Sequence, residues 1–297
     1  PGANTNLDSS GTNHATAVEL ARRSGSPIFL YLAGDFPQSI VEAADVGYAA
    51  TMAPKLVGFG REVDRALAAA VPGTPVTYIG HSYGVSIVGT AEQEGLRADR
   101  VVYASSAGTG IHATEWHDPN PNVQRYSMTA PGDPIALSQS APYNPHGANT
   151  LGGDPDEVPG VIRLDTGYYG ATNPLHPDEV VFGPDGHGKY WHDPDSDAFR
   201  NLAGVISGGD VIGYVERGIE GDNVDIDVGD DGDFAAELYD LARAQAGAVV
   251  SGAELPGLLP RIPTFDGIED PYGHPVVTDN PGRGPAIVVP TADSSRC

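Results

Sequence analysis

Five short apolar runs stand along the first two thirds of the chain, each bounded by glycine, proline or polar residues. A continuous apolar run of this length is typical of a strand that is buried on both faces of a sheet. The predicted strands are, in order, SPIFLYLAGD (26–35), PVTYIG (75–80), ADRVVYASS (98–106), NVQRYSMTA (122–130) and GVIRLDTG (160–167), with DEVVFG (178–183) as an alternative to the last.

Segments with helical patterns separate these runs. They are TAVELARRSG (16–25), residues 38–70 in two or more pieces with a break at Pro54, the segment after Ser82, DPDSDAFRNLAGVISG (193–208) and DDGDFAAELYDLARAQAG (230–247). Strands that alternate with helices or long crossovers predict parallel pairing and right-handed connections. The expected fold is therefore α/β, a mostly parallel sheet with helices on both faces.

The pattern changes in the last third of the chain. Strand signals fade beyond residue 192, and from Leu255 onward the sequence is rich in proline and glycine. These residues favour turns and extended backbone, so we expect a tail that lies on the surface. The predicted organisation is a core of residues 1–208, with 1–26 as an N-terminal segment, and a helical and Pro/Gly-rich extension of residues 209–297 packed on it.

One serine lies where the second predicted strand ends and a helix begins. Ser82 is the centre of GHSYG (80–84), a Gly-x-Ser-x-Gly pattern. At a strand-to-helix corner this pattern is typical of a nucleophile elbow, in which the serine hydroxyl stands exposed above the sheet. The flanking glycines let the strand and helix approach closely while the serine takes a strained conformation. The alternative is an ordinary glycine-rich turn.

The same corner predicts donors for a developing negative charge. The backbone N–H of Tyr83 opens the helix after Ser82 and points toward the place where a carbonyl oxygen would become negative. A second donor is expected from the loop after the first predicted strand, LAGDFPQS (32–39), at the backbone N–H of Asp35 or Phe36.

A serine hydroxyl is a weak nucleophile and needs a base and an orienting acid. In elbow enzymes the acid follows the serine in the chain and lies in a loop after a later strand. Asp133 fits, because it follows the fourth predicted strand and a Pro-Gly turn. Asp165 and Asp185 are the alternatives. Asp133 could also cap a helix that begins at Pro134.

The base is expected beyond the acid. Among the nine histidines, His187 lies in FGPDGHGKYWHD (182–193), a glycine-bracketed loop after a short apolar run, and is the leading candidate. His192 and His146 are the alternatives. His81 is inside the elbow and is expected to pack or hydrogen bond rather than act as the base.

Charge and composition exclude several other functions. The chain carries 40 acidic residues against 16 lysines and arginines, for a formal net charge of −24. This excess disfavours binding to nucleic acid and to anionic membranes. No apolar stretch of the sequence approaches the roughly 20 residues that span a bilayer. The single cysteine, Cys297, cannot form an internal disulfide.

No cofactor is predicted. The acidic segment 222–233 does not fit the helix-loop-helix calcium pattern, because a frame from Asp227 puts Gly229 third and Leu238 twelfth. The sequence has no His-Glu-x-x-His and no cysteine pair for zinc, and no Gly-x-Gly-x-x-Gly opens a βαβ unit.

The elbow, the acid loop APGDPI (130–135), His146–Gly147 and GHGKYW (186–191) together resemble an actinobacterial α/β-hydrolase family of largely unassigned function. The resemblance covers roughly residues 26–208, about three-fifths of the chain. It implies an α/β-hydrolase fold with Ser82 as nucleophile, Asp133 as acid and His187 as base. It also implies a secreted or envelope-associated protein. Because the chain starts without a leader, an export signal would have been removed or would lie upstream.

The sequence thus predicts a serine hydrolase that cleaves a small-molecule or lipid carboxylic ester through an acyl-enzyme. Two alternatives stay open. The same triad could hydrolyse amides or peptides, or the domain could be a catalytically silent binding module of a longer exported protein. The sequence does not indicate an oligomeric state.

Overall fold

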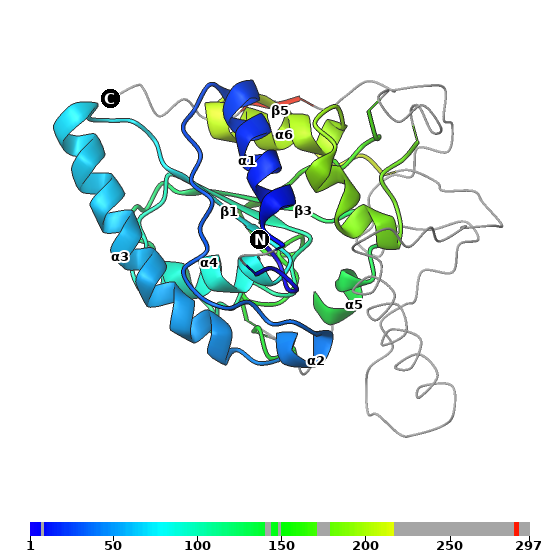
Figure 1. Ribbon diagram of the computed structural model, residues 1–297, viewed down its shortest axis with the longest axis horizontal. Helices are drawn as coiled ribbons and strands as arrows, with labels where there is room; N and C mark the ends of the chain where they lie inside the picture. Colours follow the sequence, from blue (N-terminus) through cyan, green and yellow to red (C-terminus); the bar gives the residue numbers. More distant parts are fainter. Residues whose placement is uncertain (7–8, 140–143, 148–149, 171–178, 217–287, 291–297) are drawn as a thin grey trace.

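The computed structural model describes residues 1–6, 9–139, 144–147, 150–170, 179–216 and 288–290. A parallel four-stranded sheet in the order β1-β2-β3-β4 lies at the centre of these residues (Figure 1). Its strands are β1 (Thr77–His81), β2 (Arg100–Ala104), β3 (Gln124–Met128) and β4 (Val161–Arg163). Four of the five predicted runs are therefore strands, and the predicted parallel α/β class is confirmed.

Strand β2 shows why these runs are apolar at every position. It pairs with β1 on one side and β3 on the other, and all five of its residues are buried. Val101 and Tyr103 pack into one hydrophobic cluster, whereas Val102 and Ala104 pack into the other, because successive side chains point to opposite faces. A strand with helices on both faces has no solvent side, so the run shows no alternation.

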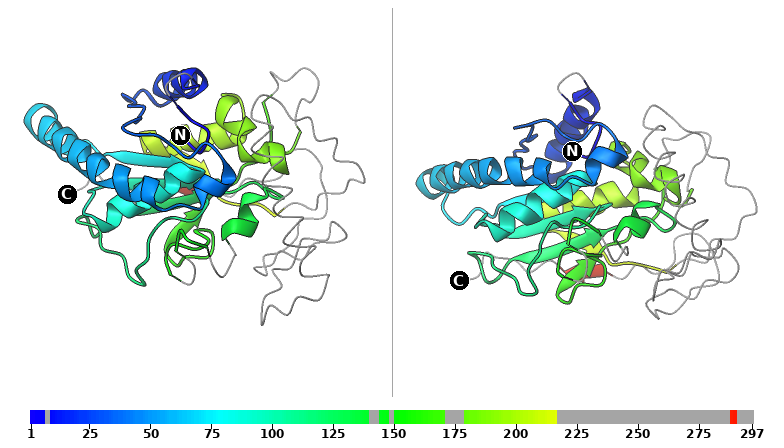
Figure 2. Two further views of the ribbon diagram at one scale, coloured as in Figure 1. Left: turned by 60° about the horizontal axis from the view of Figure 1, so that its bottom comes forward. Right: turned by 90° about the horizontal axis from the view of Figure 1, so that it is seen from below.

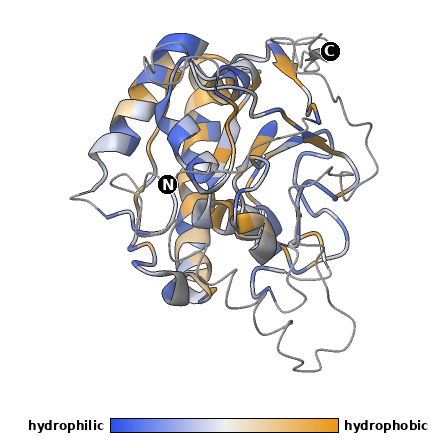
Figure 3. Ribbon diagram, turned by 90° about the vertical axis from the view of Figure 1, so that its right-hand side faces the viewer, coloured by the Kyte–Doolittle hydropathy of each residue, from blue (hydrophilic) through white to orange (hydrophobic). Residues whose placement is uncertain are grey.

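Helices cover both faces of the sheet (Figure 2). On one face, the cluster containing Val101 also holds residues of α3 (Gly47–Ala70) and α4 (Tyr83–Gln93). On the other face, the cluster containing Val102 holds residues of α1 (Gly11–Ser24) and α6 (Asp197–Ser207). Figure 3 shows hydrophobic positions, in orange, on the interior strands and helices, with hydrophilic positions, in blue, on the outer helices. The remaining α-helices among the described residues are α2 (Ile40–Ala43) and α5 (Ile135–Gln139). No described helix has the length and apolar character needed to cross a membrane.

The first predicted strand is wrong. Residues 26–33, all of them described, form no strand, and Phe29 is 66% exposed. Their aromatic side chains are directed to α3 instead. Phe29 meets Phe59 edge-on at 5.5 Å between ring centroids, and the Tyr31 hydroxyl donates to the Met52 carbonyl at 3.1 Å. These contacts explain the difference, because they hold the segment against the helix.

The predicted break at Pro54 is also wrong. The helical region is in two pieces, but the gap between α2 and α3 falls at residues 44–46, and Pro54 lies inside α3. A proline in a helix leaves the carbonyl four residues earlier without its usual partner. Both Pro54 and Ala50 lie on the exposed side of α3, where water can satisfy that carbonyl.

Two further elements complete the described chain. Strands β5 (Asp210–Ile212) and β6 (Val288–Pro290) form a separate antiparallel pair. The alternative strand at 178–183 makes an isolated bridge between Val180 and Tyr168. The predicted helix at 230–247 and the acidic segment at 222–233 lie outside the described residues, as does nearly all of the predicted tail.

Candidate active site

Ser82 occupies a sharp corner between β1 and α4. Its backbone has φ 53° and ψ −125°, a conformation that residues other than glycine rarely adopt. Such a conformation costs about 1–3 kcal/mol and persists only where the surroundings impose it. Gly80 makes the corner possible, because a Cβ at that position would lie 2.5 Å from Val85 Cα. The predicted strand, serine turn and helix are all present in this order.

Three side chains from distant parts of the chain meet at this corner. His187 Nε2 lies 3.1 Å from Ser82 Oγ, and His187 Nδ1 lies 3.0 Å from one Asp133 oxygen and 3.1 Å from the other. Ser82 and Asp133 are each 2% exposed and His187 is 6% exposed. The structure therefore brings the leading serine, acid and base candidates together in one buried chain of hydrogen bonds.

The carboxylate fixes the direction of those hydrogen bonds. An ionised carboxylate can only accept, so Nδ1 of His187 carries the proton and donates it to Asp133. The other ring nitrogen, Nε2, then has a free lone pair directed at the Ser82 hydroxyl. This is the tautomer that a general base needs.

Asp133 has two partners. It follows β3 and precedes α5, and its Oδ1 also accepts the backbone N–H of Ile135 at 2.9 Å. The predicted helix-capping role and the contact with His187 thus coexist in one side chain. The cap holds the carboxylate in a fixed orientation toward the imidazole.

His187 ends the short helix η1 (Pro184–His187), and the residue that anchors this loop is His81. His81 Nε2 donates to the His187 carbonyl at 2.8 Å, and its ring stacks on Trp191 at 4.9 Å with a 23° tilt. Burial, followed by the proximity of His187, lowers the pKa of His81 well below its usual value. His81 is therefore neutral. The sequence suggested a hydrogen-bonding role for it but did not reveal that its partner is the His187 loop.

The alternative acids and bases make other contacts. His146 Nε2 donates to the Ala43 carbonyl, and His192 Nδ1 lies 2.8 Å from the Thr16 hydroxyl. Asp185 pairs with Lys189 at 2.6 Å near the surface. Asp165 is buried beside Asn201, whose side-chain amide donates to the Asp165 carbonyl.

The predicted oxyanion donors have different surroundings. Tyr83 is the first residue of α4, and its hydroxyl ties the helix start to the Asp45 carbonyl at 2.5 Å. Phe36 is buried in the same hydrophobic cluster as Tyr83, and Asp35 is exposed. The loop that carries Phe36 is held by the N-terminal segment, where the Asn4 N–H donates to the Pro37 carbonyl at 2.6 Å.

Pro1 and Gly2 lie directly on the elbow. A Cβ on Gly2 would stand 2.7 Å from Ser82 Cβ and 3.2 Å from Ser82 Oγ. A Cβ on Gly84 would stand 2.2 Å from the Pro1 carbonyl oxygen. This N-terminal cover, Pro1–Gly2, contributes to the burial of the serine, and no pattern in the sequence indicates it.

A metal site is not evident in the described part of the chain, where no group of three or more His, Cys, Asp or Glu side chains is arranged to hold an ion. Ser82, His187 and Asp133 form hydrogen bonds with one another. The arrangement is suited to proton transfer and nucleophilic attack.

Residues 8–142 match the model of a family described as alpha/beta hydrolase. The matched region runs from α1 through the elbow to α5 and contains Ser82 and Asp133, whereas His187 lies beyond it. No curated protein and no solved structure matches the chain. The parallel sheet, the covering helices and the family match define an α/β-hydrolase fold, and the match supports hydrolase activity.

Proposed function

We propose that this protein is a serine hydrolase that cleaves carboxylic esters, with Ser82 as nucleophile, His187 as general base and acid, and Asp133 as the orienting carboxylate. The observation that carries the proposal is the buried Ser82–His187–Asp133 chain, with contacts of 3.1 and 3.0 Å between residues 105 and 54 positions apart. Ser82 also has a strained backbone conformation, with φ 53°. Strain of this kind is concentrated at functional sites.

The reaction begins when Ser82 Oγ attacks the acyl carbon and passes its proton to His187 Nε2. The acyl carbonyl becomes a tetrahedral oxyanion. As it collapses, the bond to the alcohol oxygen breaks and that oxygen takes the proton from Nε2. The product alcohol leaves, and the acyl group remains bonded to Ser82 Oγ.

Water completes the cycle. His187 Nε2 accepts a proton from water, whose oxygen attacks the acyl carbon. When the second oxyanion collapses, the bond to Ser82 Oγ breaks and the serine recovers its proton. Asp133 stabilises the imidazolium in both halves of the reaction and keeps Nδ1 protonated.

The oxyanion would lie at the start of α4. The Tyr83 N–H is in the first turn of that helix, where backbone donors and the helix dipole favour negative charge. We assign the second donor to the backbone N–H of Phe36 or Asp35, in the loop that the N-terminal segment holds. Esters are favoured over amides because an alkoxide leaving group depends less on protonation than an amine does.

Two assays test the proposal. The purified protein should hydrolyse p-nitrophenyl butyrate and react with a fluorophosphonate probe, and Ser82→Ala should abolish both. Ser207→Ala is the matched control, because Ser207 is exposed at the end of α6. His187→Ala should lose nearly as much activity as Ser82→Ala, and the double variant hardly more, since triad members act as a unit. His192→Ala is the control for the histidine.

Asp133→Asn separates the two roles of the acid. An asparagine oxygen can still accept from the Ile135 N–H, so the melting temperature should stay within a few degrees of the wild type. The amide cannot hold the required histidine tautomer, so kcat should fall by about four orders of magnitude. Equal activity in the wild type and Ser82→Ala would refute the nucleophile. Hydrolysis of a p-nitroanilide in preference to the ester would favour an amidase, and absence of both labelling and turnover would favour a binding module.

A further inference from the structure

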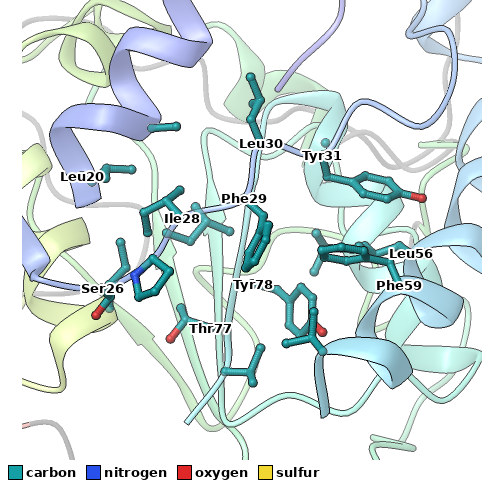
Figure 4. Close-up of a pocket in the computed structure, with 18 of the residues that line it drawn as sticks. Leu20, Ser26, Ile28, Phe29, Leu30, Tyr31, Leu56, Phe59, Thr77 and Tyr78 are labelled. Atoms are coloured by element: carbon teal, nitrogen blue, oxygen red, sulfur yellow. The ribbon is translucent and has the colours of Figure 1, made fainter. Parts of the chain in front are cut away.

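A cavity of about 300 Å³ lies beside the elbow, and Figure 4 shows side chains that line it. It is bounded by α1, α3, the start of α4, one edge of β1 and the segment 26–31. This is the segment that the sequence predicted to be a strand. Because it leans on α3, it leaves a space along β1.

Most of the residues that line the cavity are apolar. None of the described residues that line it has a charged side chain, although the whole chain carries 40 acidic and 16 basic residues. Its walls include Phe29, Tyr31 and Phe59, which meet one another edge-on or tilted, and Tyr78. Ile28 and Leu20 line the other side. The lining also includes the neutral polar side chains of Asn13, Thr16, Ser26, Thr74 and Thr77. A mostly apolar wall without charged side chains favours hydrocarbon over a carboxylate or a phosphate.

One end of the cavity lies near the proposed catalytic residues. It extends from Thr74, before β1, to Gly84, two residues after Ser82, and to Trp191, four residues after His187. A strand rises about 3.3 Å per residue, so the path from Val76 to Ser82 is about 20 Å long.

We propose that this cavity binds the acyl chain of the ester, which makes the enzyme favour acyl groups longer than acetyl. The assignment rests on the proposed function, because it places the ester carbonyl at Ser82 and the methyl end of the acyl chain toward Val76. Apolar surface that leaves water on binding supplies the selectivity.

The N-terminal cover stands between the cavity and the serine. Pro1 lines the cavity, and Gly2 rests on Ser82. A substrate whose chain fills the cavity must place its carbonyl group where Gly2 now lies. Binding of the acyl chain therefore displaces Pro1–Gly2 from the elbow.

The test compares p-nitrophenyl acetate, butyrate, hexanoate and octanoate below their solubility limits. In the wild type, kcat/KM should rise about fourfold for each added methylene, as expected for hydrocarbon moved from water to an apolar site. Leu67→Trp introduces a large ring at the end of the cavity far from Ser82. It should lower the octanoate-to-acetate ratio of kcat/KM at least tenfold, whereas Ala66→Trp should leave this ratio unchanged. Ala66→Trp is the matched control, because Ala66 is exposed on the same helix and does not line the cavity.

A binding measurement gives a readout that needs no catalysis. Methyl octanoate should raise the melting temperature of Ser82→Ala and of Ser82→Ala/Ala66→Trp, but not of Ser82→Ala/Leu67→Trp. Absence of turnover at every chain length would refute the proposed esterase, and the melting data would still decide whether the cavity takes the chain. A flat chain-length profile, or the same melting shift in both double variants, would show that the cavity is only a packing gap at the sheet edge.

Discussion

Glu92 offers a sharp test of the electrostatics of this fold. It lies on α4 in a buried cluster beneath the sheet, where it accepts a hydrogen bond from the Tyr103 hydroxyl and pairs with Arg125 at 2.9 Å. Arg125 also lies 3.5 Å from Asp118, and its guanidinium stacks over the Trp116 ring at 3.7 Å. Burial raises the pKa of Glu92 from 4.5 to about 7, and outweighs the opposing effect of Arg125.

The direction of the effect on stability follows from proton binding. Between pH 4.5 and 7 the folded protein keeps the Glu92 proton, whereas the unfolded chain loses it. The free energy of unfolding therefore falls as pH rises through this window. The difference between the two pKa values corresponds to about 3 kcal/mol. Glu92→Gln cannot titrate, so the wild-type free energy of unfolding should fall by that amount relative to the variant between pH 4.5 and 8.

Urea denaturation at pH 4.5, 5.5, 6.5 and 8 measures this difference directly. Acidification also reduces the repulsion among the excess acidic residues, but that effect is common to both proteins and cancels in the comparison. Glu62→Gln is the control, because it makes the same substitution at an exposed residue, which is paired with Arg65. A Glu92→Gln profile that runs parallel to that of the wild type would refute the reasoning.

Three further predictions address other features. His81→Phe keeps a ring against Trp191 but removes the donor to the His187 carbonyl. We expect kcat to fall about tenfold and the melting temperature to change little. An unchanged kcat would show that the His187 loop needs no anchor. Gly2→Leu cannot rest on Ser82, so a small fluorophosphonate should label the serine faster than in the wild type; equal labelling rates would show that Pro1–Gly2 does not limit access. Sodium chloride at about 0.15 M screens interactions between charges that are more than about 8 Å apart. Because the chain has a formal charge of −24, the salt should raise its melting temperature. A melting temperature that stays the same or falls would contradict this.

The sequence predicted the parts of the site that local rules determine. Glycines around Ser82 indicated the elbow because no larger residue fits at Gly80 against Val85. The order of serine, acid and base limited the choice of partners, since each follows a later strand of the sheet. Asp133 and His187 could be proposed on this basis, although their contact depends on packing between loops 54 residues apart.

Other features could not be predicted because they depend on competition between distant contacts. The run at 26–33 has the composition of a strand, but whether it pairs is decided by the attraction of its aromatic rings to α3. Pro54 usually ends a helix, and its tolerance depends on which side of α3 meets water. The link from His81 to the His187 carbonyl requires the position of a loop that no local pattern encodes.

The contact between Gly2 and Ser82 has a kinetic consequence. If Ser82 is the nucleophile proposed above, Pro1–Gly2 must move away before a substrate reaches this serine, which is 2% exposed, so we expect a closed and an open population of the protein. If about 1% of molecules are open, the apparent affinity for any substrate is about a hundredfold weaker than that of the open form. A small, fast covalent inhibitor would then show a labelling rate that levels off as its concentration increases. The plateau would equal the opening rate, and an acyl chain in the neighbouring cavity would shift the population toward the reactive form.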